Sequence, residues 1–142
     1  EIKFFYKKWR DNANVIDKWF ETQVIYATGE KAISTVSGLT KHPSFKPKNP
    51  NRFRSVIGTF AERNLLGFHQ QDGKGYEFIT NWLIKHDQIN PQTTARICTV
   101  FDNWKVFDTK RQTQMVNNLQ RLLTIPNISR NTYEIVDSIL KK

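Results

Sequence analysis

The sequence predicts an all-α protein of about eight helices that pair as antiparallel hairpins. Two observations support this fold class. Apolar residues recur near every 3.6 residues along most of the chain, whereas no segment shows the period-2 alternation of a strand. Short polar turns separate the apolar stretches, and a row of hairpins without a sheet is typical of a solenoid-like helical array. At 142 residues the chain fits one domain, which we expect to span residues 1–142.

Three amphipathic helices are predicted before the first proline. Their apolar residues are Phe4, Phe5 and Trp9 within residues 2–10, then Val15, Ile16, Trp19, Phe20 and Val24, and then Ala32, Ile33, Val36 and Leu39. Gly29 is expected to end or follow the second of these helices. Pro43, Pro47 and Pro50 interrupt the pattern, because proline lacks an amide donor and blocks the preceding helical turn.

Capping signals mark the starts of the later helices. The capping residues are Asn49, Asn90, Asp108 and Ser129. Each of the two asparagines precedes a proline, which is favoured at the first helical position. The apolar residues that follow at helical spacing are Phe53, Val56, Ile57 and Phe60; Phe78, Ile79, Trp82 and Leu83; Ile97, Cys98, Phe101 and Trp104; Met115, Leu119, Leu122 and Leu123; and Ile135, Val136, Ile139 and Leu140.

The charge balance restricts the classes of partner. The chain carries 22 Lys and Arg residues against 13 Asp and Glu residues, a net charge of +9. That surplus favours acidic partners such as nucleic acid or an anionic surface, although basic residues also serve as ordinary helix surface. No apolar run approaches the roughly 18 residues of a membrane span, so no membrane partner is predicted. The single cysteine, Cys98, cannot form an internal disulfide, which favours a reducing compartment and a cytoplasmic location.

The sequence contains no recognisable catalytic or metal-binding motif. His42, His69 and His86 lack the i, i+4 spacing of a metal-binding helix pair, and one cysteine cannot make a zinc finger. Cys98 lies on an apolar face, where a thiol behaves as a small hydrophobic group. The "DGKG" segment, residues 72–75, lacks the rest of a phosphate-binding P-loop, so the turn chemistry of a loop from Gly67 to Gly75 explains it better. We therefore assign no catalytic residue, metal or cofactor to this chain.

Residues 91–104 are predicted to form one helix with an informative polar stripe. At about 100° per residue, four polar residues share this stripe: Gln92, Arg96, Thr99 and Asn103. The opposite face carries Thr94, Ile97, Cys98 and Phe101. A solvated face accounts for the polar stripe. The alternative is a recognition surface in which Gln92 and Arg96, one turn apart, contact a carboxylate or a backbone carbonyl.

Arg52 and Arg54 leave the same two alternatives open. Both follow the Asn49-Pro50 start signal, and Arg54 leaves the helix on its polar side. One interpretation is ordinary surface charge. The other is a basic lip that faces an acidic partner domain or substrate.

The order of these motifs resembles a known family. "HPSF", "NPNRFRSVIGTFAERN", "FHQQDGKGYEF", "INPQTTARI" and "FDTKRQTQM" together resemble the C-terminal helical domain of bacterial aminopeptidase N, a zinc alanyl aminopeptidase of the gluzincin metallopeptidases. "VIDKWFETQ" is similar to the Met-Asp-Lys-Trp-Phe segment of that family, and the resemblance runs from about residue 4 to the end. Two turns depart from it. Asn64-Leu65-Leu66-Gly67 stands where the family often has Asn-Pro, and Lys74 replaces a small residue.

The resemblance implies an armadillo-like α–α superhelix that caps the catalytic chamber of a larger multi-domain enzyme and limits entry to peptides. In the family, the catalytic domain carries the His-Glu-x-x-His zinc motif, a distant glutamate ligand and the Gly-x-Met-Glu-Asn exopeptidase motif. These motifs are not in this sequence. We therefore expect this chain to be a piece of a longer polypeptide, inactive alone, with the catalytic domain and peptide substrates as its partners.

The resemblance also implies site residues. "NPQTTAR" matches the family pattern Asn-Pro-Gln-x-x-x-Arg, which places Gln92 and Arg96 in the wall of the substrate chamber. Arg54, Asn49 and Asn51 match the "NPNRxR" segment, which implies a chamber or interface contact. Gln92 and Arg96 would act by hydrogen bonds and charge on the peptide rather than by bond chemistry.

Two function hypotheses follow. The leading one is the C-terminal domain of a cytoplasmic zinc aminopeptidase that removes neutral or basic N-terminal residues from short peptides. The alternative is a basic helical binding module for nucleic acid or an acidic protein. The basic residues are spread over nearly every helix rather than gathered in one stripe, so no nucleic-acid partner is predicted for the leading hypothesis.

Overall fold

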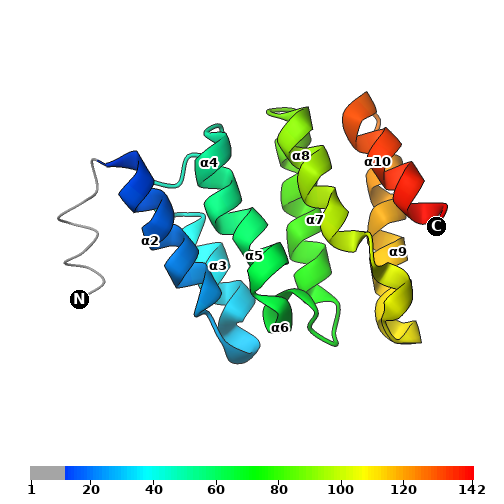
Figure 1. The fold of residues 1–142 in the computed structure, drawn as a ribbon, viewed down its shortest axis with the longest axis horizontal. Coiled ribbons are helices and arrows are strands. Elements are labelled where there is room, and N and C mark those ends of the chain that lie inside the picture. The colour runs from blue at the N-terminus through cyan, green and yellow to red at the C-terminus, as the bar shows by residue number, and fades with distance from the viewer. Residues whose placement is uncertain (1–11) are drawn as a thin grey trace. The chain divides into compact units, whose positions relative to one another are not determined.

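The computed structural model describes residues 12–142, which consist of helices, turns and bends without a strand. The all-α fold class is therefore confirmed for this range. The basic helix expected over residues 2–10 lies outside the described residues. The chain divides into two compact units, Glu1–Gly67 and Phe68–Lys142 (Figure 1).

Unit 1 consists of one long helix and a broken helical run that packs along it. Its elements are α2 (Ala13–Ile25), the 3₁₀ turn η1 (Gly29–Lys31), α3 (Ala32–Leu39), α4 (Pro50–Phe53), the π-helical η2 (Arg54–Gly58) and α5 (Thr59–Arg63). α4, η2 and α5 follow one another directly and pack against α2 (Figure 1). The predicted cap is confirmed, because Asn49 Oδ1 accepts from the backbone amides of Asn51, at 3.0 Å, and Arg52, at 3.2 Å.

The core of unit 1 follows the predicted apolar spacing. The fully buried side chains include Phe20, Val24, Val36, Phe53, Val56, Ile57 and Phe60. The sequence did not predict the π turn in this run. The amide of Thr59 bonds to the carbonyl of Arg54, five residues back, and the Thr59 hydroxyl donates to the same carbonyl at 3.2 Å. The Ser55 hydroxyl donates to the carbonyl of Asn51 at 2.7 Å. These hydroxyl groups are second donors to carbonyls that also accept a backbone amide.

Unit 2 consists of two helical hairpins. Its elements are α7 (Lys74–Asp87), α8 (Pro91–Cys98), the 3₁₀ turns η3 (Thr99–Phe101) and η4 (Trp104–Val106), α9 (Thr109–Leu123) and α10 (Arg130–Leu140), preceded by the short α6 (Leu65–Phe68). α7 packs on α8, α9 packs on α10, and α10 also packs on α8 (Figure 1). The predicted caps are confirmed: Asn90, Asp108 and Ser129 accept from the amides of Thr93, Arg111 and Thr132.

Two predicted boundaries were wrong. The helix expected over residues 91–104 ends at Cys98 and continues as 3₁₀ turns. The Thr99 hydroxyl donates to the carbonyl of Arg96 at 2.7 Å, and such local side-chain bonds compete with the α-helical ladder. The loop expected from Gly67 to Gly75 also contains the end of α6 and the first turn of α7. Its turn chemistry is as predicted, because Gly73 adopts a left-handed φ of 77° before α7 begins.

A buried carboxylate fixes α10 to α7. Asp87 is 1% exposed and lies at the last position of α7. It accepts from the Ser129 amide at 2.7 Å, the Ser129 hydroxyl at 2.6 Å and the Thr132 hydroxyl at 2.6 Å. The negative charge thus lies at the N-terminus of α10, where the helix dipole favours it. Because α10 packs on α8, this network also supports the helix that carries Gln92 and Arg96.

Candidate functional site

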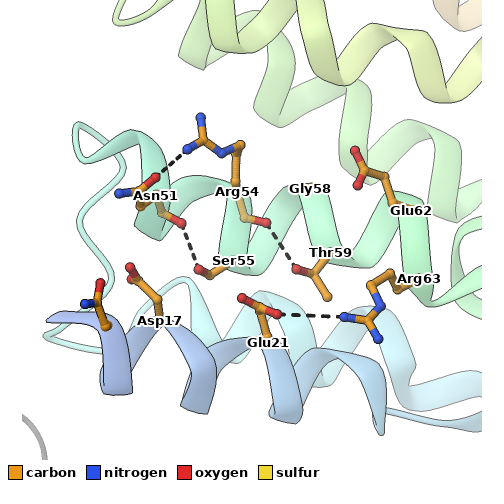
Figure 2. A pocket seen from close by; sticks show the side chains of 10 residues that line it. Asp17, Glu21, Asn51, Arg54, Ser55, Gly58, Thr59, Glu62 and Arg63 are labelled. Atoms are coloured by element: carbon orange, nitrogen blue, oxygen red, sulfur yellow. Dashed lines mark hydrogen bonds and ion pairs between the residues drawn. The ribbon is translucent and has the colours of Figure 1, made fainter. Parts of the chain in front are cut away.

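An open cavity of about 530 Å³ lies in unit 1, between α2 and the run from α4 to α5 (Figure 2). Its lining is polar and charged: Asn14, Asp17, Glu21, Asn51, Arg54, Ser55, Gly58, Thr59, Glu62 and Arg63. Two of the predicted site residues, Asn51 and Arg54, belong to this lining. The third residue of that motif, Asn49, does not line the cavity and instead caps α4.

Arg52 does not form a basic lip. The basic-lip interpretation of the two arginines was therefore wrong for Arg52. The residue is 6% exposed. Its Nε donates to Asp17 Oδ1 at 2.5 Å, its Nη1 donates to the Ser44 carbonyl, and its guanidinium lies 5.7 Å from the centre of the Phe20 ring. Arg52 is therefore a structural cation that joins the start of α4 to α2. It also lowers the pKa of the adjacent His42, although burial of that imidazole is the larger cause.

The cavity presents a positive group and a negative group at the two ends of the η2–α5 run. Arg54, half-buried, is the first residue of η2, and within residues 12–142 its guanidinium bonds to the amide oxygen of Asn51. Glu62 lies near the end of α5 and is exposed, with no ion pair to any residue in 12–142. Figure 2 shows both side chains on the run above α2, while Asp17 and Glu21 rise from α2 below it.

The remaining charges of the cavity are partnered. Asp17 pairs with the buried Arg52. Glu21 lies 3.8 Å from Arg63 Nη1 and 3.8 Å from Lys18 Nζ. Arg54 and Glu62 are thus the cavity charges without an oppositely charged partner among the described residues.

The π turn shapes one wall of the cavity. Ser55, Gly58 and Thr59 all line it, and all belong to η2 or follow it directly. Single π turns inside helices are often found at functional sites, because they widen the helix and redirect side chains. Sequence reasoning missed these residues and the acidic ones on α2. The available signal was the i, i+4 pair of Asp17 and Glu21 on the polar side of the second predicted helix.

The second group of predicted residues lies on α8 in unit 2. Gln92 and Arg96 are exposed on successive turns, whereas Thr93, Thr94, Ile97 and Cys98 are buried. Neither the Gln92 amide nor the Arg96 guanidinium forms a hydrogen bond or ion pair within residues 12–142. Of the predicted polar stripe, Gln92 and Arg96 therefore lie exposed on α8, whereas Thr99 and Asn103 come after this helix ends at Cys98. The two side chains offer an amide and a cation on neighbouring turns of one helix face, which suits hydrogen bonding to a peptide or a carboxylate.

His69 and Tyr76 form a structural cluster rather than a reactive one. Their Nδ1 and hydroxyl atoms lie 2.6 Å apart, and the imidazole stacks on Phe107 with ring centres separated by 4.4 Å. Burial raises the pKa of Tyr76 to about 12, so the phenol stays protonated at neutral pH. Burial and the nearby Arg111 lower the pKa of His69. Arg111 Nε donates to the His69 carbonyl at 2.9 Å, which fixes the loop before α7 to α9.

No metal centre is present among residues 12–142, because no three His, Cys, Asp or Glu side chains gather closely enough to hold an ion. Burial raises the pKa of Cys98 to about 12, so its thiol is protonated at neutral pH. Burial lowers the pKa of His86 to about 4, and the neighbouring Asp87 opposes that shift. Within the same residues, no helix is long and apolar enough to span a bilayer.

The fold and the family comparison agree on the class of protein: an array of armadillo-type helical repeats. A family model described as "Domain of unknown function (DUF3458_C) ARM repeats" matches residues 2–141. The chain belongs to this family of ARM-repeat domains. The armadillo-like architecture expected from the sequence is thereby confirmed.

The relatives found by sequence carry the family name expected from the motifs. The chain is 38% identical to aminopeptidase N of Haemophilus influenzae over 137 residues, which is 96% of this chain and 16% of that protein. It is 40% identical to aminopeptidase N of Escherichia coli over 135 residues, 94% of this chain and 15% of that protein. The chain therefore spans about one sixth of the length of these relatives.

A solved structure is also similar. The crystal structure of Legionella pneumophila aminopeptidase A in complex with aspartic acid matches with a TM-score of 0.90 at 26% sequence identity. The match covers 99% of this chain and 16% of that chain. Like the sequence relatives, this protein is much longer than the chain described here.

Proposed function

We propose that residues 1–142 form the C-terminal helical domain of a zinc-dependent aminopeptidase of the aminopeptidase N type, located in the cytoplasm. In that enzyme the domain caps the catalytic chamber and limits entry to peptides. Its partners are the catalytic domain of the same polypeptide and the peptide substrates. The identity of 35–40% to proteins named aminopeptidase N along nearly the whole chain supports this proposal.

The exposed pair on α8 carries the mechanistic part of the proposal. Gln92 and Arg96 lie on consecutive turns, and neither side chain forms a hydrogen bond or ion pair with another side chain in residues 12–142. An exposed amide beside an exposed guanidinium donates readily to the carbonyl groups of an extended peptide. The role of the pair is to hold the peptide beyond the bond that is cleaved. Correct positioning of a substrate lowers the entropic part of the barrier.

Zinc does not fit the described residues, because they contain no cluster of metal ligands. The metal and the residues that activate water at it would belong to other parts of the full-length polypeptide. This chain alone carries no catalytic motif, and we propose that it is inactive by itself. Its contribution is enclosure and orientation.

The test uses the full-length enzyme with Gln92→Ala, Arg96→Ala and both together. Arg96→Ala should lower kcat/KM for tripeptides and longer peptides by about tenfold or more, since a hydrogen bond from a charged group contributes about 1.5–3 kcal/mol. Gln92→Ala should lower it by about two- to tenfold, since a bond between neutral groups contributes about 0.5–1.5 kcal/mol. The zinc content, measured by elemental analysis, should not change. Arg130→Ala is the matched control, because its side chain is 89% exposed and pairs only with Glu134 on α10. Unchanged turnover of several peptide lengths in the double variant would refute the role.

A further inference from the structure

We propose that the loop between α3 and α4 binds the phosphate backbone of a double-stranded nucleic acid through Lys41, Lys46 and Lys48. Residues 40–49, which join the two helices, are called the lysine loop (Figure 1). The loop belongs to unit 1, and none of its residues lines the cavity described above. It also shares no residue with the α8 pair. Binding there would be a second function, beside the aminopeptidase activity proposed for the full-length polypeptide.

The acidic residues of the chain leave one long gap. Residues 31–61 contain no Asp or Glu, and they contain six basic residues: Lys31, Lys41, Lys46, Lys48, Arg52 and Arg54. This stretch has a net charge of +6, against +9 for the whole chain. The excess of positive charge is therefore concentrated in one part of the sequence, although Lys and Arg themselves are spread along the chain.

Three of these cations are exposed on the lysine loop. Lys41, Lys46 and Lys48 form no ion pair within residues 12–142. Arg52 differs, because it is buried and pairs with Asp17. That pair neutralises a carboxylate of α2, the helix on which the loop packs. The lysine loop thus presents positive charge that the described residues do not compensate.

The backbone of the lysine loop is anchored to α2 and α4. Phe45 is 7% exposed, and its ring centre lies 6.4 Å from that of Phe20. The ring of His42 also packs on Phe20, with ring centres 5.5 Å apart. From the start of α4, the buried Arg52 donates to the Ser44 carbonyl. Because these contacts already order the loop, binding at its lysines costs little backbone entropy.

Lysine side chains favour a ligand with many negative charges. An ammonium group is a compact charge on a flexible stem, so it pairs with an anion in many orientations. Three such groups within residues 41–48 suit repeated charges better than a single anion of fixed shape. A nucleic-acid duplex presents one negative charge per about 1.7 Å of its axis, and binding releases the counterions condensed there. Its phosphates would therefore meet the three lysines in any register.

The rest of the lysine loop disfavours other anionic partners. Single strands are held largely by stacking on aromatic rings, but Phe45 is buried and the half-buried His42 packs on Phe20. Binding in a membrane interface uses apolar side chains that insert, and the large apolar side chains exposed among residues 12–142 all lie outside the loop. An acidic protein would need carboxylates at fixed complementary positions. A duplex backbone needs none of these features.

The test measures binding of the full-length polypeptide to short, fluorescently labelled DNA and RNA duplexes by anisotropy. Three phosphate contacts predict that the logarithm of the binding constant falls with the logarithm of the salt concentration with a slope of about −2.7 or steeper. Affinity should then fall about 40-fold or more between about 25 and 100 mM salt. Two unrelated sequences should bind equally, because phosphate contacts carry no sequence information. The duplex that binds more tightly, DNA or RNA, identifies the natural source of the backbone.

Variants of equal net charge then separate the lysine loop from the total charge. Lys41→Gln, Lys46→Gln and Lys48→Gln together should make the slope shallower by about 2.7, and each single change by about 0.9. The matched control changes three exposed lysines of unit 2 to Gln: Lys74, Lys105 and Lys110. The control should keep the slope of the parent. All six side chains are exposed, so the circular dichroism spectra of both triple variants should match that of the parent.

Three results would overturn the proposal. The first is no binding of either duplex at the lowest salt concentration. The second is an equal loss of slope in the two triple variants, which would assign the binding to net charge alone. The third is stronger competition from polyglutamate, or from phosphatidylserine vesicles, than from unlabelled duplex at the same concentration of charge. None of these results affects the α8 test, because that test measures peptide turnover with the lysine loop unaltered.

Discussion

Two arginines that lie two positions apart should respond very differently to the same substitution. We expect Arg52→Met to lower the free energy of unfolding by about 3–5 kcal/mol, the usual cost of breaking a buried ion pair. We expect Arg54→Met to change it by no more than about 0.5 kcal/mol, as for most surface substitutions. Methionine retains much of the apolar stem in both cases, so the comparison isolates the loss of the guanidinium group.

The magnitude follows from the surroundings of each side chain. The Arg52 side chain is 7% exposed and that of its partner Asp17 is 14% exposed. Removing Arg52 leaves a nearly buried carboxylate without its cation, and it also leaves the Ser44 carbonyl without a donor. Arg54 bonds only to the exposed amide of Asn51, which water can replace. We therefore expect a large loss of unfolding free energy from Arg52→Met and almost none from Arg54→Met.

The assay is urea unfolding of the 142-residue chain, followed by circular dichroism and by hydrogen exchange of amides in α2 and α4. Hydrogen exchange localises the loss to unit 1. Adding Asp17→Leu to Arg52→Met should recover much of the stability, because an apolar pair replaces a buried ionic one with little penalty. Equal stability of Arg52→Met and Arg54→Met, or an additive loss in the double variant, would refute the reasoning.

Two further predictions concern unit 2. Asp87→Asn should lower the free energy of unfolding by about 2–3 kcal/mol, because three donors lose a charged acceptor. Asp102→Asn removes only an exposed ion pair, so it should lower the free energy of unfolding by less than about 0.5 kcal/mol in the same urea assay. The pKa of His86, about 4, lies below its unfolded value, so between pH 6.5 and 4 the unfolded chain binds more protons. The contribution of neutral His86 to stability should therefore be complete above pH 6.5 and decrease as the pH drops towards 4. The urea midpoint should be lower at pH 5 than at pH 7, and His86→Gln should reduce this difference.

The helix starts were predictable because capping chemistry is local. Asn49, Asn90, Asp108 and Ser129 each bond to an amide two or three residues ahead, so the sequence window that specifies the bond is short. The apolar faces were predictable for a similar reason, since helical periodicity brings residues three and four positions apart together whatever the tertiary arrangement. The end of α8 also depends on a local contact, the bond from the Thr99 hydroxyl to the Arg96 carbonyl. That bond requires one particular Thr99 rotamer, which cannot be predicted from the sequence.

The cavity was not predictable in the same way, because its parts come from distant segments. Arg52 and Asp17 are 35 positions apart, and so the burial of that arginine depends on how α4 docks on α2. The π turn has no dependable sequence signature, yet it sets where Ser55 and Thr59 lie. Asp87 and Thr132 are 45 positions apart, and their bond likewise appears only after α7 and α10 pack.

Helix geometry nevertheless limits the alternatives for the two arginines. Residues two positions apart differ by about 200° around a helix, so Arg52 and Arg54 cannot share one face and cannot both form the same basic lip. Docking on α2 resolves the choice by burying Arg52 against Asp17. That pair neutralises one of the acids that line the cavity and leaves Arg54 as its open cation. The structural ion pair thus sets the charge pattern of the cavity, and breaking it should leave Asp17 as an unpaired carboxylate in the lining.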